Sequence, residues 1–204
     1  MAVLLFAGCN SSSTPAANTS TSTAESAPKP AATAEPVAGE TALWPMYTAA
    51  HGMAPDVAIL RLTSKEVPGF TQQDGKAAAW VATFASPSTR IFRVDTYSIV
   101  SKPPDFYRGT SAGVKQPWRG ESRDEMPLDT STLSVDSDAA YKTAVADPDT
   151  AAWLKKNPDK KLTLIELGNV FRYHAPVWYL TWGDAKSGGY AVYVNATTGK
   201  VIKG

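Results

Sequence analysis

The sequence predicts an α+β protein in which short helices pack on antiparallel sheet. Three observations favour this class. Several short segments alternate apolar and polar residues between turn residues, which is the pattern of half-buried strands. Other segments repeat their apolar residues at helical spacing. The order helix–strand–strand–strand then occurs twice along the chain of 204 residues.

The first helical segment lies just before the first strand segment. Leu43, Trp44, Tyr47 and Ala50 recur at the spacing of one helix face. Pro45 is compatible with a helix only within its first turn, because proline lacks the N–H that later turns require. We therefore expect this helix to begin near residue 42.

The second helical region covers residues 134–157 and has the pattern of two short helices. Ser134 is the expected N-cap of the first, because a serine hydroxyl accepts a hydrogen bond from a backbone N–H of the first turn. Asp147-Pro148 is expected to begin the second, because proline is favoured at the first helical position.

Strand patterns account for most of the remaining chain. They occupy 57–62, 77–84, 90–100, 161–174 and 175–184, with the fourth either continuous or broken at Gly168. Residues 66–76 and 101–134 are rich in turn residues, and we expect them to be irregular. A closing hairpin is predicted from Tyr190–Val194, a turn at Asn195–Gly199 and a return strand at 200–203.

The Thr198-Gly199-Lys200 segment of that hairpin does not fit a phosphate-binding loop. Such a loop requires a glycine five positions before Gly199, where this chain has Val194, and a Ser or Thr after the lysine, where it has Val201. The segment is therefore interpreted as a turn.

The two halves of the chain align with one another. The aligned pairs are Ala77/Ala175, Trp80/Trp178, Thr83/Thr181, Phe84/Trp182, Val94/Val194 and Asp95/Asn195. We expect two α+β units, at residues 42–133 and 134–204. Chance similarity between half-buried strands would produce the same matches.

The second half resembles the PepSY family. The resemblance is carried by Pro176–Trp182, by Tyr190–Ala196 and by the turn Thr198–Val201, with Asn195 at a position where the family usually has Asp. It implies a helix before the strands, which the 134–157 region supplies. It also implies binding or peptidase inhibition rather than catalysis. The first half lacks a Thr-Gly-Lys turn and resembles the family more loosely.

The N-terminus resembles the lipobox of bacterial lipoproteins. Residues 1–9 form a short apolar run ending in Phe6-Ala7-Gly8-Cys9, with Phe at a position where Leu is usual. The basic segment of a signal peptide is missing, which a start codon assigned too late would explain. The resemblance implies that Cys9 carries lipid and attaches the protein to a membrane.

Residues 10–41 have the composition of a disordered tether. Ala, Ser, Thr and Pro supply 24 of these 32 residues, and Val37 is the only large aliphatic side chain. Such a segment cannot bury enough apolar surface to offset the entropy of ordering it. Lipid, tether and folded domain together predict a cell-envelope protein facing the periplasm or the exterior.

Several function classes are disfavoured by composition. A net charge of +1 provides no electrostatic basis for nucleic-acid binding. One Cys and two His make a structural zinc site improbable. No nucleophile motif is present, and the paired acids lie in polar contexts typical of helix caps. We therefore expect no cofactor, no metal and no catalytic residue.

Aromatic and basic side chains in the 101–134 segment form a candidate interaction surface. Phe106, Tyr107, Trp118 and Arg119 are of the types that dominate binding hot spots. The alternative is that they hold the segment against the sheet. We expect a non-catalytic envelope protein that binds a protein or peptide and modulates a peptidase. A glycan or small-ligand module using these aromatics is the alternative, and an envelope hydrolase is less favoured.

Overall fold

The computed structural model describes residues 34–123, 125–184 and 188–203. Within these residues the chain forms three α-helices and one antiparallel sheet of nine strands, which confirms the α+β class. The helices are α1 (Gly39–Ala50), α2 (Ser137–Ala146) and α3 (Pro148–Lys156). The strands are β1 (Ala58–Lys65), β2 (Ala79–Ser86), β3 (Ile91–Ser98), β4 (Gly109–Ser111), β5 (Gln116–Pro117), β6 (Leu162–Val170), β7 (Ala175–Trp182), β8 (Tyr190–Asn195) and β9 (Val201–Ile202).

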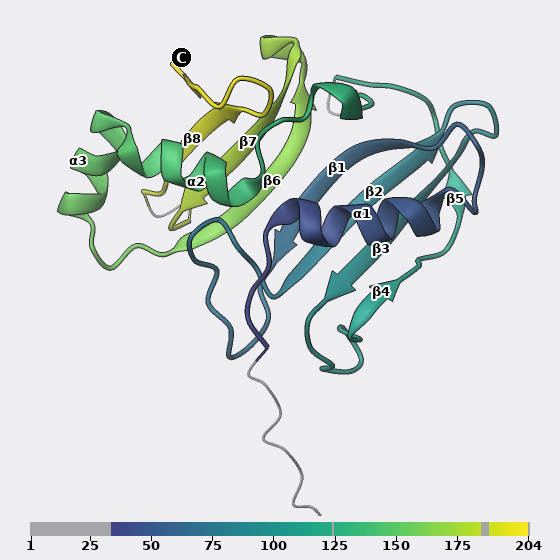
Figure 1. Ribbon diagram of the computed structural model, residues 1–204, viewed down its shortest axis with the longest axis horizontal. Helices are drawn as coiled ribbons and strands as arrows, with labels where there is room; N and C mark the ends of the chain where they lie inside the picture. The colour runs from purple at the N-terminus through teal and green to yellow at the C-terminus, as the bar shows by residue number, and fades with distance from the viewer. Residues whose placement is uncertain (1–33, 124, 185–187, 204) are drawn as a thin grey trace, which may run out of the picture. The chain divides into compact units, whose positions relative to one another are not determined.

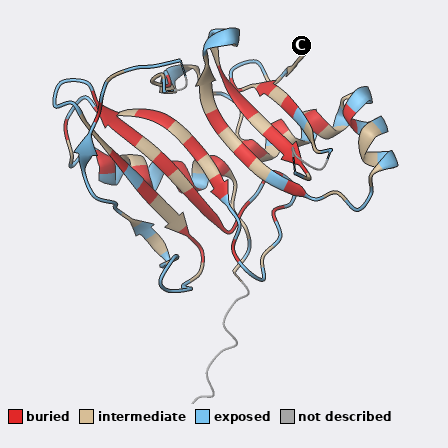
Figure 2. Ribbon diagram, turned by 180° about the vertical axis from the view of Figure 1, so that it is seen from behind, coloured by how far each residue is buried: buried red, intermediate tan, exposed pale blue. Residues whose placement is uncertain are grey.

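The sheet has the order β4-β3-β2-β1-β6-β7-β8-β9, and β5 pairs with the beginning of β3. The described helices lie on one face of it, with α1 over β1 to β3 and α2 beside β7 and β8 (Figure 1). Alternation along β7 shows the two environments, since Trp178 and Leu180 are buried beneath the helices whereas Tyr179 points to the opposite face. We call that opposite face the open face; Figure 2 views the sheet from this side.

The two halves meet where β1 pairs with β6 in the middle of the sheet. Trp80 of β2 and Trp178 of β7 are both buried, and their ring centroids lie 6.4 Å apart in an edge-to-face arrangement. The indole of Trp80 donates to the carbonyl of Val37, and that of Trp178 donates to the carbonyl of Val135. Each tryptophan thus anchors the residue two positions before its own helix.

The strand pairings contradict one part of the predicted alignment of the halves. Trp80 pairs with Tyr97, whereas Trp178 pairs with Val194, so Tyr97 corresponds to Val194. The predicted pair Val94/Val194, and with it Asp95/Asn195, is therefore displaced by three residues. An odd displacement exchanges sheet faces. Accordingly Val94 is 37% exposed, whereas Val194 is completely buried.

The fold begins earlier than the composition predicted. Residues 34–41, assigned to the tether, belong to the folded unit, and Val37 exchanges backbone hydrogen bonds with Ala77. Helix α1 begins at Gly39, which places Pro45 inside the helix rather than in its first turn. The missing N–H of Pro45 leaves the exposed carbonyl of Thr41 without its helical donor. The lipobox, with Cys9, and residues 10–33 lie outside the described residues.

Local features of the second half also differ from expectation. Asp136, not Ser134, caps α2, and its carboxylate accepts from the backbone N–H of Ser137. Asp147-Pro148 begins α3 as predicted. Strand β6 continues through Gly168 to Val170. Within the 101–134 segment the chain forms β4, β5 and a 3-10 turn at Thr130–Thr132, so this segment is less irregular than expected.

A single buried hydroxyl joins the two halves beneath the helices. The Oγ of Ser137 accepts from the backbone N–H of Gly39 at 2.8 Å and donates to the carbonyl of Gly75 at 2.6 Å. Gly75 has a φ of +74°, and a Cβ there would lie 2.3 Å from the carbonyl oxygen of Ser137, so only glycine fits. Asp136 accepts from the backbone N–H of Glu40 across the same junction.

We predict that Ser137→Ala destabilises the fold by about 2 to 4 kcal/mol, because a buried N–H and a buried carbonyl both lose their partner. Urea unfolding followed by circular dichroism measures the change. Ser134→Ala is the matched control, since Ser134 is exposed, and its free energy of unfolding should stay within about 0.5 kcal/mol of the parent. Equal stability of the two variants would contradict the assigned role.

Candidate functional site

The four residues of the predicted interaction surface do not come together. Trp118 is only 6% exposed and packs against Leu60 and Ala85 on the open face. Phe106 is half-buried at the other end of β3, packed with the cluster around Ile99. Tyr107, 54% exposed, and Arg119 remain at the surface.

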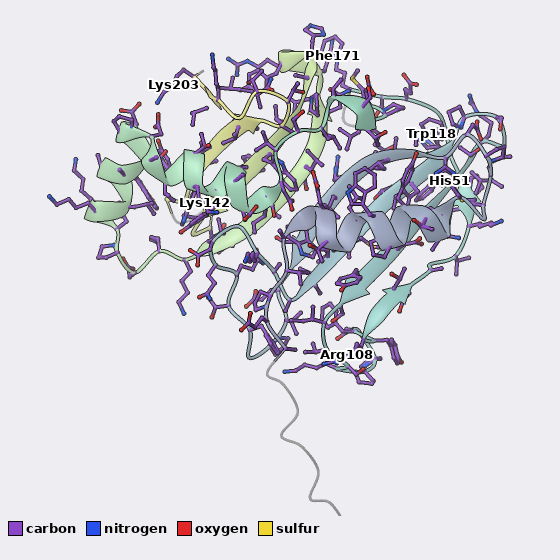
Figure 3. The ribbon with its side chains drawn as sticks, in the orientation of Figure 1. His51, Arg108, Trp118, Lys142, Phe171 and Lys203 are labelled. Carbon is purple, nitrogen blue, oxygen red and sulfur yellow. The ribbon has the colours of Figure 1, made fainter. Side chains whose placement is uncertain are left out.

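The geometry of β3 explains this separation. Strand β5, just before Trp118, pairs with Ile91, whereas β4, just after Tyr107, pairs with Ser98. Seven residues of extended strand correspond to about 23 Å. Figure 3 accordingly shows Arg108 and Trp118 near opposite ends of the strands around β3. The alternative interpretation, in which aromatic side chains hold the segment on the sheet, therefore describes Trp118.

A different cluster of aromatic and arginine side chains lies at the far end of the sheet. Tyr179 of β7 is paired with Tyr193 of β8, and their rings stack with centroids 4.8 Å apart. Tyr173 lies in the turn between β6 and β7, and its ring centroid is 5.3 Å from that of Tyr193. The guanidinium of Arg172 lies 5.5 Å from the centre of the Tyr173 ring. These four residues form one continuous surface.

The surroundings of Tyr193 keep its hydroxyl protonated. Burial raises the pKa of Tyr193, and the neighbouring Tyr179 and Tyr173 raise it further. At neutral pH the Tyr193 hydroxyl is therefore uncharged and can both donate and accept a hydrogen bond.

The turn that carries the cluster is itself exposed. Phe171 is 46% exposed, with its ring 5.3 Å from His174 and 5.3 Å from the guanidinium of Arg123. His174 ends the turn in a left-handed conformation, with φ +48°. Figure 3 shows Phe171 at the tip of this turn. The ring contact makes His174 part of the turn's packing.

The cluster borders a groove of about 310 Å³ that runs along the edge of the sheet. We call this the edge groove. Its lining includes Arg172, Tyr173, Tyr190, Tyr193, Ile202 and Lys203. Strands β8 and β9 supply its floor, the β6–β7 turn supplies one end, and the start of α3 supplies the other. Tyr190 stacks on Trp153 of α3, which fixes that wall.

An ion-pair network fixes β9 to the start of α3. The ammonium of Lys203 lies 2.5 Å from Asp147 and 2.9 Å from Asp149. Asp147 also caps α3 by accepting from the backbone N–H of Thr150. The hydrogen bond from Lys203 lowers the pKa of Asp147, and the two carboxylates raise the pKa of Lys203. Among the groove residues named above, Arg172 is then the cation that forms no ion pair with a carboxylate of the described residues.

The centre of the open face is neutralised by its own side chains. Glu166 lies 3.7 Å from Arg61 and accepts from the hydroxyl of Thr63 at 3.1 Å. The edge groove differs from this central region because its aromatic side chains and Arg172 line an open groove.

The described residues offer no arrangement for metal binding. Across 34–123, 125–184 and 188–203, no three His, Cys, Asp or Glu side chains gather where they could hold a metal ion. His51 contacts the Tyr47 ring, far along the chain from His174. None of the helices in the described part of the chain has the length and apolarity to cross a membrane. Comparison with known families, curated proteins and solved structures finds no match for this chain.

We predict that Lys203→Met raises the pKa of Asp147 toward its ordinary value, because the lysine is the main cause of the lowered pKa. Carboxyl ¹³C chemical shifts followed through an acid titration measure this. Asp129 is the internal control, because hydrogen bonds from Ser131 lower its pKa independently of Lys203, and its titration should not move.

The same variant defines a window of pH-dependent stability. A lowered Asp147 pKa stabilises the fold above the ordinary carboxylate pKa of about 4 and loses that effect as pH falls through the lowered value. A raised Lys203 pKa stabilises it below about pH 10 and loses the effect at higher pH. The stability difference between parent and variant should therefore be widest between those limits and vanish in strong acid. A constant difference would contradict the ion pair.

Proposed function

We propose that this chain is a non-catalytic, lipid-anchored protein of the bacterial cell envelope whose folded domain binds a protein or peptide partner and thereby modulates a peptidase. The observation that supports binding is the edge groove, where three tyrosines and an arginine line a hollow beside the last strands. Tyr and Arg are the side chains most enriched in binding hot spots.

The groove is suited to a polypeptide partner. Tyrosine rings supply apolar area with little conformational entropy, while their hydroxyls remain available to a peptide backbone. The guanidinium of Arg172 lies against an aromatic ring and is exposed. A concave edge combining these features accommodates an extended segment of another chain.

We further propose that residues 134–204 are a PepSY-like unit and residues 34–133 a diverged second copy. The closing turn supports this, because Asn195 accepts from the backbone N–H groups of Thr197 and Thr198, and Gly199 has φ +69°. The equivalent anchoring of Trp80 and Trp178 supports the internal repeat. PepSY-like units occur in propeptides that inhibit peptidases, and this resemblance is the basis for the proposed peptidase modulation.

The glycan-binding alternative has no continuous aromatic surface in the 101–134 segment. It depended on Phe106, Tyr107 and Trp118 acting together, and Trp118 is buried at the opposite end of β3 from the other two. No specific observation favours a hydrolase.

We predict that replacing both Tyr173 and Tyr193 with alanine lowers partner recovery at least about tenfold, because hot-spot truncations cost about 2 kcal/mol or more. The experiment is a pull-down from envelope extract with the full chain carrying Cys9→Ser, read by quantitative mass spectrometry. Tyr107→Ala is the control, since that ring is more exposed than Tyr173 or Tyr193 but does not line the groove. Unchanged recovery with the double variant would refute groove-mediated binding.

The lipid anchor has a separate test. Intact-mass spectrometry of the protein isolated from membranes should find Cys9 as the modified N-terminal residue, as the resemblance to a lipobox implies. Cys9→Ser should abolish the modification and release the chain from the membrane fraction, because no second acyl signal remains. An unprocessed Met1 on the membrane-bound protein would exclude the anchor.

A further inference from the structure

The outer side of β9 presents unpaired backbone groups. In an antiparallel pair, residues alternate between hydrogen-bonding to the partner and pointing away from it. The backbone N–H of Asn195 donates to the carbonyl of Lys200, and Tyr193 is the register partner of Ile202. Lys200 and Ile202 therefore face β8, so the N–H and C=O groups of Val201 and Lys203 point outward. No strand in the described part of the chain pairs with that side.

Side chains around this edge alternate in a way that selects a ligand. Ile202 lies on the open face beside Tyr193, where the edge groove continues to Tyr173 and Arg172. Val201 lies on the opposite face, where it packs against the main core. A strand added to β9 would thus place alternate residues beside the tyrosines and beside the start of α3.

The charges at this edge differ between the two faces. On the helix side, Lys203 is held by Asp147 and Asp149, so acidic side chains there would meet carboxylates. On the open face, Arg172 and Lys200 carry positive charge, and neither forms an ion pair with a carboxylate of the described residues. Complementarity therefore requires acidic residues at the alternate positions that face Arg172.

We propose that the edge groove binds an extended segment of a partner protein by strand addition to β9, and that this segment alternates acidic with apolar residues. This deepens the proposed binding function and rests on it. Main-chain hydrogen bonds to Val201 and Lys203 would supply affinity, and Arg172, Lys200 and the tyrosines would supply selectivity.

A second copy of this chain is a poorer occupant of the same edge. Pairing β9 with another β9 would bring Lys200 of both copies to the same short edge, and lysine on an edge strand is a common means of preventing such pairing. The same charge attracts an acidic strand. One feature therefore disfavours self-association and favours the proposed partner.

The test uses a fluorescein-labelled, C-terminally amidated peptide of four Val-Glu repeats, titrated against the full chain carrying Cys9→Ser. Fluorescence anisotropy measures affinity, and amide hydrogen exchange measures protection of Val201 and Lys203. We expect the peptide to bind and both amides to gain protection. A peptide of four Val-Lys repeats should bind about tenfold more weakly or not at all, because it opposes the local charge.

Two variants separate strand addition from a general charge effect. Val201→Pro removes an N–H that points outward, so it should preserve the β8–β9 pairing while weakening the acidic peptide about tenfold. Arg172→Glu should weaken it by a similar factor through charge. Lys156→Glu, on the exposed surface of α3, is the matched control and should leave affinity within about twofold, because its charge lies outside the groove.

The outcomes distinguish this inference from the broader function. Absence of acidic-peptide binding, equal binding of the lysine peptide, or full binding by Val201→Pro would overturn strand addition. Self-association in sedimentation velocity that Val201→Pro abolishes would also overturn it, in favour of a second copy. If these results accompany a pull-down that still depends on Tyr173 and Tyr193, the proposed function survives without strand addition. If that dependence is absent, both fail.

Discussion

The structure depends on the two tryptophans that lie beneath its helices. Each is completely or almost completely buried, and each uses its indole N–H to hold the carbonyl that precedes a helix. A buried indole N–H without a partner is costly, so this hydrogen bond fixes both the ring and the start of the helix. Because the two rings also contact each other, the positions of α1 and α2 are set relative to one another and to the central β1–β6 pair. The remaining strands extend outward from this centre.

Placing the described helices on one face leaves the other face and the sheet margins as the accessible surfaces. The helix-side face is occupied by the main core, and the middle of the open face is satisfied internally by Arg61, Thr63 and Glu166. Trp118 covers part of the open face near β3. The other edge of the sheet ends in the short strand β9, where aromatic side chains and unpaired backbone groups lie side by side. The candidate site therefore lies at the one margin of the described sheet where a groove and an unpaired strand edge coincide.

Sequence reasoning succeeded where local chemistry decides structure and failed where register decides it. Periodicity located the helices and the longer strands, and Asp147-Pro148 marked the start of α3. The alignment of Val94 with Val194 was wrong because similar residue types on two strands do not reveal which face of the sheet each residue occupies. The tyrosine cluster was missed for the same reason. Tyr179 and Tyr193 were recognised as strand residues, but only cross-strand pairing and the turn at Tyr173 bring the three rings together.

Ser137 has a consequence for how the two halves relate. Its hydroxyl lies at the start of the second half, yet both of its partners, Gly39 and Gly75, belong to the first. Either half alone would keep a polar group whose only described partner is in the other half, in addition to an unpaired central strand. The two halves therefore share polar groups that neither half satisfies alone, and we expect them to unfold together as one cooperative unit.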